Sequence, residues 1–264
     1  MTSSNLFSFG LQKWLERLWA AILLAGQAVW HLVKVQINYQ NTLNQCLSVG
    51  PGSLMISLVT ALFVGAVFTI QVAREFIYFG AGEAVGGVLA LALTRELAPV
   101  LTAVVLAGRV GSAFAAEIGT MRVTEQIDAL YILKTDPIDY LVMPRMVACC
   151  LMLPVLTLLS LIIGLAGGLV IATQLYDISQ SVFMDSIQSF MGIWDIASAL
   201  IKAVVFGALV AIIGCSWGMT TSGGAKGVGQ STTTAVVTAL LAIFVANFFL
   251  SWLMFQGPGQ ALTE

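Results

Sequence analysis

Residues 35 to 73 carry no charged side chain, and this run constrains the fold more than any other feature of the sequence. A helix needs about 20 apolar residues to cross the roughly 30 Å hydrocarbon core of a bilayer. Several further runs reach that length, and the 264-residue chain is 59% hydrophobic and only 9% charged. With a mean hydropathy of +0.96, the composition predicts an all-α integral membrane protein.

The apolar runs predict an N-terminal interfacial helix followed by five transmembrane helices. The apolar stretch at 18–30 is too short to span and is flanked by tryptophans and charges, which is typical of a helix lying in the membrane interface. The predicted spans are 53–73, 85 to about 107, 146–173, 203–219 and 235–255. We therefore expect an N-terminal interfacial segment at 1–50 and one membrane domain at 51–264, with a loop at 174–198.

The distribution of Lys and Arg predicts the orientation, because cytoplasmic loops carry an excess of these residues. A cytoplasmic N-terminus places most of the cations inside, namely Lys13, Arg17, Lys34, Arg109, Arg122, Lys134, Arg145 and Lys226. Arg74 and Lys202 then fall outside or near the outer edge, and the predicted loop at 174–198 has no cation. Since the number of predicted spans is odd, the C-terminus is expected on the outer side.

Arg95 and Glu96 lie inside the second predicted span, shortly before Pro99. A charge at the bilayer centre costs roughly 2.5–3.5 kcal/mol on insertion scales, so such residues are rarely kept without a role. Neighbouring residues of a helix point about 100° apart, which prevents these two from pairing face to face. Each is expected to find a partner on another helix, in water or at a lipid headgroup. They either line a polar cavity open to the outer side or brace the helix around Pro99.

Small residues recur at every fourth position from the second span onward, at Ala103, Ala107, Gly111, Ala115 and Gly119. Stripes of this kind let helix backbones approach closely in lipid and gain dispersion contacts. The stripe fits packing inside one chain and a subunit interface between two chains equally well.

The segment at 115–130, AAEIGTMRVTEQIDAL, is charged and amphipathic in a chain that is otherwise mostly apolar. Its charged residues are Glu117, Arg122, Glu125 and Asp128, and helical spacing gathers the acidic ones on one face. The segment is too polar to span, which predicts a cytoplasmic helix between spans two and three. It is either a solvated loop helix or a docking helix that transmits motion from a cytoplasmic partner.

The sequence contains no recognisable catalytic or metal-binding set. His31 is the only histidine, which excludes a histidine pair for zinc and a Ser-His-Asp triad. The segment at 222–233, SGGAKGVGQSTT, resembles a phosphate-binding loop but has Gln230 where that loop needs lysine. We expect a glycine turn there, with the threonines capping the fifth helix. A net charge of −2 without a basic cluster argues against nucleic-acid binding.

Four motifs, in order along the chain, resemble the signature of the MlaE permease family. They are LTRELAPV at 93–100, AGRVGSAFAAEIGTMRVTEQIDAL at 107–130, DPIDYLVMPR at 136–145 and GGAKGVGQSTTTAVV at 223–237. The resemblance implies a homodimeric permease of an ABC transporter that moves phospholipids or related lipids between envelope membranes. It also implies a location in a bacterial inner membrane or a plastid inner envelope.

Under this resemblance the chain itself is no enzyme and binds no cofactor, because a separate cytoplasmic ABC ATPase hydrolyses the ATP. A lipid-binding protein with a mammalian-cell-entry domain is expected on the outer side. The segment from Glu117 to Leu130 is then the coupling helix seated in the ATPase, and Arg95 and Glu96 lie near an outward-facing lipid cavity.

A hypothesis of a different class is a membrane scaffold or channel-like oligomer without energy coupling, for which the small-residue stripe alone suffices. The cytoplasmic acidic helix argues against it. The two hypotheses differ in whether this chain changes ATP hydrolysis by a partner.

Overall fold

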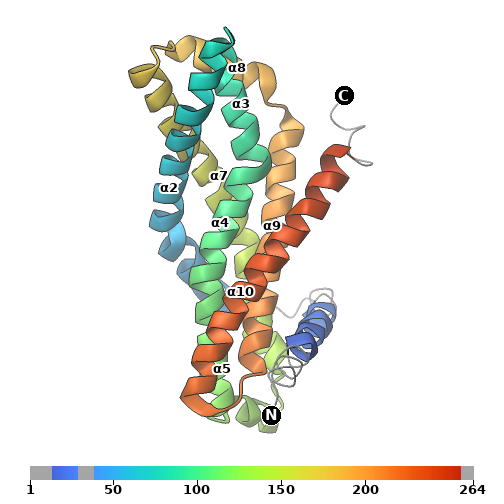
Figure 1. The fold of residues 1–264 in the computed structure, drawn as a ribbon. Coiled ribbons are helices and arrows are strands. Elements are labelled where there is room, and N and C mark those ends of the chain that lie inside the picture. The colour runs from blue at the N-terminus through green and yellow to red at the C-terminus, as the bar shows by residue number, and fades with distance from the viewer. Residues whose placement is uncertain (1–13, 29–38, 257–264) are drawn as a thin grey trace, which may run out of the picture. The chain divides into compact units, whose positions relative to one another are not determined.

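The computed structural model describes residues 14–28 and 39–256, and every regular element within these ranges is helical (Figure 1). The first helix covers 14–28, and the others are α2 Tyr39–Tyr78, η1 Gly82–Ala84, α3 Val85–Ala92, η2 Leu93–Leu97, α4 Ala98–Leu106, η3 Ala107–Gly111, α5 Ser112–Val123, α6 Gln126–Ile132, η4 Ile138–Val142, α7 Met143–Leu175, α8 Gln180–Phe190, α9 Ile193–Met219, α10 Gly224–Ser251 and η5 Trp252–Gln256.

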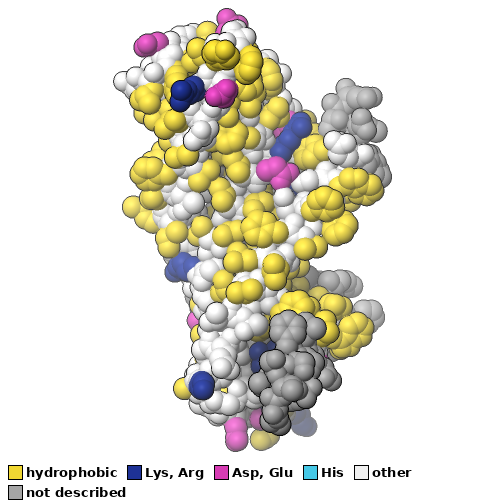
Figure 2. Space-filling model, in the orientation of Figure 1, with side chains coloured by type: hydrophobic (Ala, Val, Ile, Leu, Met, Phe, Trp, Pro, Cys, Tyr) yellow, Lys and Arg dark blue, Asp and Glu magenta, His cyan; other side chains and the backbone are white. Residues whose placement is uncertain are grey.

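Five helices in the described ranges are long and apolar enough to cross a membrane, which confirms the predicted all-α class. They are Tyr39–Tyr78, Gly82–Val123, Ile138–Leu175, Ile193–Met219 and Gly224–Gln256. Figure 2 shows apolar side chains over much of the face in view, as expected for a surface in contact with lipid.

The helices extend beyond the predicted spans because hydropathy marks only the part that suits hydrocarbon. The first spanning helix has 40 residues, which at 1.5 Å per residue rise about 60 Å, roughly twice the thickness of the bilayer core. Its first turns contain Asn and Gln and are helical without being apolar.

The chain divides into two compact units. Unit 1 draws on Met1–Leu47, Ala107–Cys149 and Ala208–Leu241, and unit 2 draws on Ser48–Leu106, Cys150–Gly207 and Ala242–Glu264. The predicted boundary between the N-terminal segment and the membrane domain, at residue 50, falls within α2. The division of the chain into these two parts remains a prediction.

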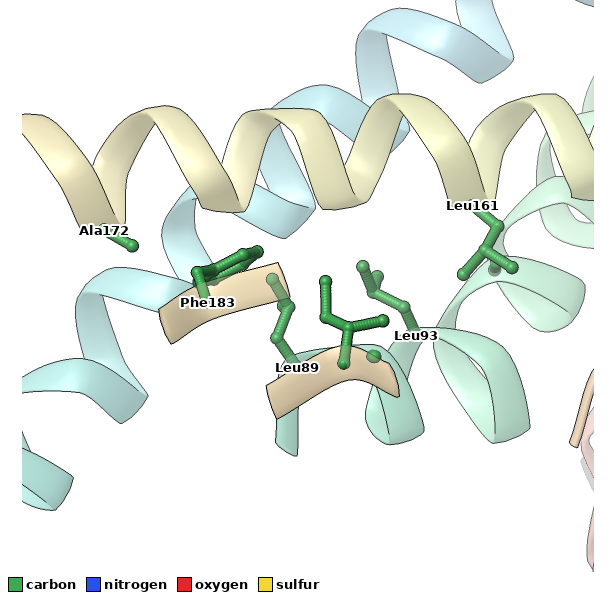
Figure 3. Packing of buried hydrophobic residues seen from close by; sticks show 8 residues of the cluster. Leu89, Leu93, Leu161, Ala172 and Phe183 are labelled. Atoms are coloured by element: carbon green, nitrogen blue, oxygen red, sulfur yellow. The ribbon is translucent and has the colours of Figure 1, made fainter. Parts of the chain in front are cut away.

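The core of unit 2 forms where α3 packs against α7 and α8. Leu89 and Leu93 point toward α7, and Phe183 lies beside Leu89 (Figure 3). The segment at 174–198, expected to be a loop, therefore contains a helix, α8, whose Phe183 and Ile187 are buried at helical spacing. The helical signal is present in the sequence, since Phe183, Ser186 and Ile187 recur at helical spacing, but the division of the chain into apolar spans did not use it.

Helices α2 and α7 approach closely at glycines in unit 2. A Cβ on Gly65 would overlap the carbonyl group of Gly164, and one on Gly167 would overlap the carbonyl oxygen of Leu62. Only the missing side chains allow this approach, which gains backbone contacts in lipid.

We expect Gly65→Ala to lower the free energy of unfolding by about 1–3 kcal/mol, because the added methyl group must push two backbones apart. Gly26→Ala is the matched control, since no atom lies within 4 Å of the Cβ position and alanine is the better helix former. Unfolding in a denaturing detergent measures both variants. Equal stability of the two would contradict the close-packing argument.

The glycine-rich segment at 222–233 is mostly helical, which corrects the predicted turn. The turn lies at residues 220–223, and Gly223 and Gly224 have φ of +90° and +65°. The threonines that follow lie inside α10, where Thr234 donates to the carbonyl oxygen of Gln230 at 2.8 Å. They do not cap the helix, because their hydroxyls donate to carbonyl oxygens of the preceding turn and accept no N–H of the first turn.

The helix at 14–28 has one face against the protein and one apolar face exposed. Ala21, Leu24 and Ala28 are buried, whereas Trp19 and Ile22 are exposed. This arrangement is compatible with the predicted interfacial helix, which remains a prediction. The rest of the predicted N-terminal segment up to residue 38, at 1–13 and 29–38, lies outside the described residues.

Candidate functional site

A network of charged side chains occupies unit 2, and it begins at the π-helical turn η2, which carries Arg95 and Glu96. Pro99 follows four residues after Arg95 and has no N–H to donate to the Arg95 carbonyl oxygen. The ammonium group of Lys202, from α9, takes that place and donates to this oxygen at 2.6 Å. Proline in the second span thus creates an acceptor that a cation on another helix satisfies.

Lys202 is completely buried, with 0% of its side chain exposed, and its charge is balanced by Glu96 at 2.9 Å. Its third partner is the hydroxyl of Ser251 at 2.7 Å. The ammonium group therefore has three acceptors, which matches its three protons. A buried charge needs this degree of satisfaction, because an unpaired one costs several kcal/mol in an apolar site.

Glu96 is itself held by two residues of α10. Ser251 and Asn247 each donate to its carboxylate at 2.6 Å. Because 44% of the Glu96 side chain is exposed, its carboxylate faces both the buried lysine and the open side of the network.

Arg95 pairs with Asp195 at 2.6 Å, and Asp195 also accepts the backbone N–H of Gly192 at 2.8 Å. The guanidinium carbon lies 4.5 Å from the centre of the Phe255 ring, in cation–π range. Arg95 remains 37% exposed. Each residue of the predicted pair has thus found its own partner on α9.

These groups border an open groove of about 510 Å³ within unit 2. Its lining residues are Leu91, Ala92, Arg95, Glu96, Phe248, Ser251, Trp252, Phe255 and Gln256. The groove thus combines two opposite charges with three aromatic rings. Such a lining fits an amphiphile whose polar head lies beside the charges and whose apolar part lies on the rings.

The sequence reasoning missed Asp195 and Lys202 as site residues and placed both near the outer edge. They lie within one helix, α9, and are seven residues apart, a spacing that puts them on one face. The same signal is present in α10, where Asn247 and Ser251 are four residues apart in an apolar run. A search for polar residues at helical spacing inside apolar runs would have found all four of these site residues.

The predicted coupling segment at 115–130 is not one helix. Its acidic residues therefore do not share one face of a single helix, as the spacing predicted. It is broken at Thr124 and Glu125, where Glu125 adopts a left-handed φ of 61°. Glu117 lies before the break, on α5, where its carboxylate binds the buried Arg145 at 2.8 Å. Only α6, with seven residues, is a separate short helix.

An ion pair spans this break. The guanidinium of Arg122, near the end of α5, binds the carboxylate of Asp128, on α6, at 2.7 Å. Both side chains are partly exposed, so the pair contributes little to stability, about 0.2–1 kcal/mol by comparison with other exposed pairs. The change of direction between the two helices lies at the left-handed Glu125.

The end of α6 presents exposed apolar side chains. Ile132 is 83% exposed and Leu133 is 72% exposed, with Tyr131 beside them. The surrounding residues are polar, including Asp128, Lys134 and Asp136, so this segment is not suited to hydrocarbon. Contiguous exposed apolar side chains are typical of surfaces that contact another protein or a membrane.

The small-residue stripe is buried within the chain at each of its predicted positions. In unit 1, Gly111 faces Val210, and Gly119 faces the side chain of Thr221. A Cβ on Gly214 of α9 would in turn lie 2.9 Å from the carbonyl oxygen of Gly111. These are contacts between helices of one chain.

The sequence profile of the family described as Permease MlaE matches residues 42–253, which include the groove residues up to Trp252 and the broken α5–α6 segment. The chain belongs to the MlaE permease family. The match covers all five helices long enough to span a membrane, at least in part.

Relatives of this MlaE permease carry names that agree with the family. A probable ABC transporter permease protein of Synechocystis is 68% identical over 250 residues, which are 95% of both chains. The chloroplastic protein TRIGALACTOSYLDIACYLGLYCEROL 1 of Arabidopsis thaliana is 52% identical over 95% of this chain and 71% of its own length. A probable ABC transporter permease protein of Rickettsia prowazekii is 42% identical over 87% of this chain and 88% of its own.

Proposed function

We propose that this permease moves phospholipids or related glycerolipids between envelope membranes, with the groove of unit 2 as the site that holds the lipid. The observation that carries this proposal is the amphiphilic lining of the groove. Arg95 and Glu96 offer both signs of charge to a headgroup, and Phe248, Trp252 and Phe255 offer apolar surface beside them. The Arabidopsis relative, which is named after a galactolipid, supports a glycerolipid substrate.

The energy for transport comes from a separate cytoplasmic ABC ATPase, which binds and hydrolyses ATP, so the permease needs no cofactor of its own. The apolar end of α6, at Tyr131, Ile132 and Leu133, supports this arrangement, since it is exposed in a polar setting. Glu125, Arg122 and Asp128 belong to the same docking region. We place this region, and the N-terminus, on the cytoplasmic side.

The complete transporter contains two copies of this chain and an outer partner with a mammalian-cell-entry domain. The C-terminus lies on the outer side, in a bacterial inner membrane or a plastid inner envelope. The excess of Lys and Arg in the segments placed inside supports this orientation.

The test is ATP-dependent transfer of fluorescent phospholipid in proteoliposomes that contain the permease together with its co-purifying ATPase. We expect Trp252→Ala to slow transfer about tenfold, equivalent to about 1.4 kcal/mol, because an exposed ring of the groove is lost. Because the Trp252 side chain is exposed, we expect its removal to have little effect on folding.

Phe244→Ala is the control, because Phe244 is an equally exposed aromatic residue of α10 that does not line the groove. Transfer at the normal rate by the Trp252 variant would contradict the groove as the lipid site. Transfer that needs no ATPase at all would favour a scaffold or channel.

A further inference from the structure

A second cavity, of about 910 Å³, lies in unit 1 and shares no residue with the lipid groove. Trp14 and Arg17 of the helix at 14–28 line one part of it. The rest of the lining comes from the turn before α10 and its first turns, namely Ser222, Lys226, Gly227, Gly229, Gln230, Thr233 and Thr234. Gly227 lies against the backbone of Ser222, and Gly229 has open space at its Cβ position.

The lining of this cavity favours an anion. Among the described residues that line it are two cations, Arg17 and Lys226, and no carboxylate. Arg17 donates to the Ser231 hydroxyl and the Thr220 carbonyl oxygen, both at 3.5 Å, which uses two of its five N–H groups. The 28-residue helix α10 begins beside them at Gly224, and the start of a helix favours negative charge.

The cavity lies at the level where a membrane changes from polar to apolar. The indole N–H of Trp14 donates to Thr238 at 3.2 Å, and the uninterrupted apolar part of α10 begins in that turn. Val237 and Leu241 of α10 are exposed beyond it, and Trp19 is exposed on the helix at 14–28. A tryptophan anchor with cations on one side and exposed apolar residues on the other is typical of headgroup depth.

We propose that this cavity binds the phosphate of an anionic glycerolipid, whose chains lie along the exposed apolar residues of α10. Basic pockets between helices at a membrane surface select anionic headgroups in this way. The bound lipid ties the helix at 14–28 to the start of α10. It is a resident lipid, separate from the transported one, and the inference does not depend on the transport proposal.

Native mass spectrometry of the full chain in detergent tests this site, with phosphatidylglycerol as the probe and phosphatidylcholine as the neutral comparison. We expect the wild-type chain to retain phosphatidylglycerol preferentially. The double variant Arg17→Gln with Lys226→Gln is expected to lose about 30-fold in affinity for it, since two cations near the surface are removed. Affinity for phosphatidylcholine stays unchanged.

Two further variants separate the site from general effects of charge and folding. Arg17→Lys with Lys226→Arg keeps both charges and is expected to keep the lipid. Lys134→Gln removes an exposed cation of unit 1 outside the cavity and is expected to bind as the wild type does. If Lys134→Gln loses as much affinity as the double Gln variant, the proposal is wrong.

Competition with inorganic phosphate distinguishes the source of the anion. Retention of phosphatidylglycerol in a large molar excess of phosphate supports a lipid site. Displacement of the lipid by phosphate would assign the cavity to the free ion and overturn the lipid proposal.

Discussion

Glu96→Ala is expected to destabilise the chain by about 3–5 kcal/mol, because it leaves an uncompensated charge in a buried site. Lys202 has no exposed side-chain area, so its ammonium group cannot turn to water for compensation. Its remaining acceptors, the Arg95 carbonyl oxygen and the Ser251 hydroxyl, are neutral. Unfolding in a denaturing detergent, followed by tryptophan fluorescence, measures the loss.

Lys202→Met, at the other end of the same ion pair, is expected to cost less, about 1–3 kcal/mol, because the main penalty is the Arg95 carbonyl oxygen, which loses the Lys202 donor. The carboxylate of Glu96 is 44% exposed, and it keeps its hydrogen bonds from Ser251 and Asn247. Removal of the cation therefore leaves a charge that remains solvated. Equal losses for the two variants would show that burial of Lys202 does not control the pair.

The double variant Glu96→Gln with Lys202→Met is the control for this argument. Without the buried charge of Lys202 it is expected to regain most of the stability that Glu96→Ala loses, as apolar replacements of buried ion pairs often do. If it also transfers lipid at the normal rate, the charges of Glu96 and Lys202 serve structure alone.

The spanning helices could be predicted from the sequence, because insertion into lipid depends on the local length and polarity of each run. The need of Arg95 and Glu96 for partners on another helix was also predictable, since the geometry of one helix excludes their pairing. The partners themselves were not. Lys202 and Asp195 shorten the apparent apolar run of α9. Their charges are balanced inside the protein by Glu96 and Arg95, which lie about 100 residues earlier in the chain and so give no local signal in α9.

The break between α5 and α6 shows a second limit of sequence reasoning. Neither glycine nor proline occurs at residues 124 and 125, so the chain carries no local signal for a left-handed residue. Glu125 adopts that conformation, which L side chains rarely do. The Arg122–Asp128 ion pair on either side of it joins residues that the sequence places on one continuous helix. Helical periodicity therefore predicted the continuity of the segment wrongly.

The double variant Ile132→Asp with Leu133→Asp is expected to weaken binding of the ATPase by about 100-fold or more, since full burial of two such side chains is worth about 3 kcal/mol or more. This prediction rests on the proposed docking role of α6. Affinity purification at several ATPase concentrations measures the change. Ile193→Asp is the control, because Ile193 is an equally exposed apolar residue at the start of α9, which we place on the outer side.

Glu125→Gln tests the competing source of docking energy, the acidic groups that the sequence suggested. Its side chain is exposed, and exposed ion pairs contribute only about 0.2–1 kcal/mol and are screened by salt. We expect at most about a fivefold loss of affinity, smaller still at high ionic strength. If Glu125→Gln loses more affinity than the Ile132 and Leu133 variant, charge drives docking. If the Ile132 and Leu133 variant loses more, as we expect, the affinity comes from the apolar end of α6, and the charges only orient the ATPase.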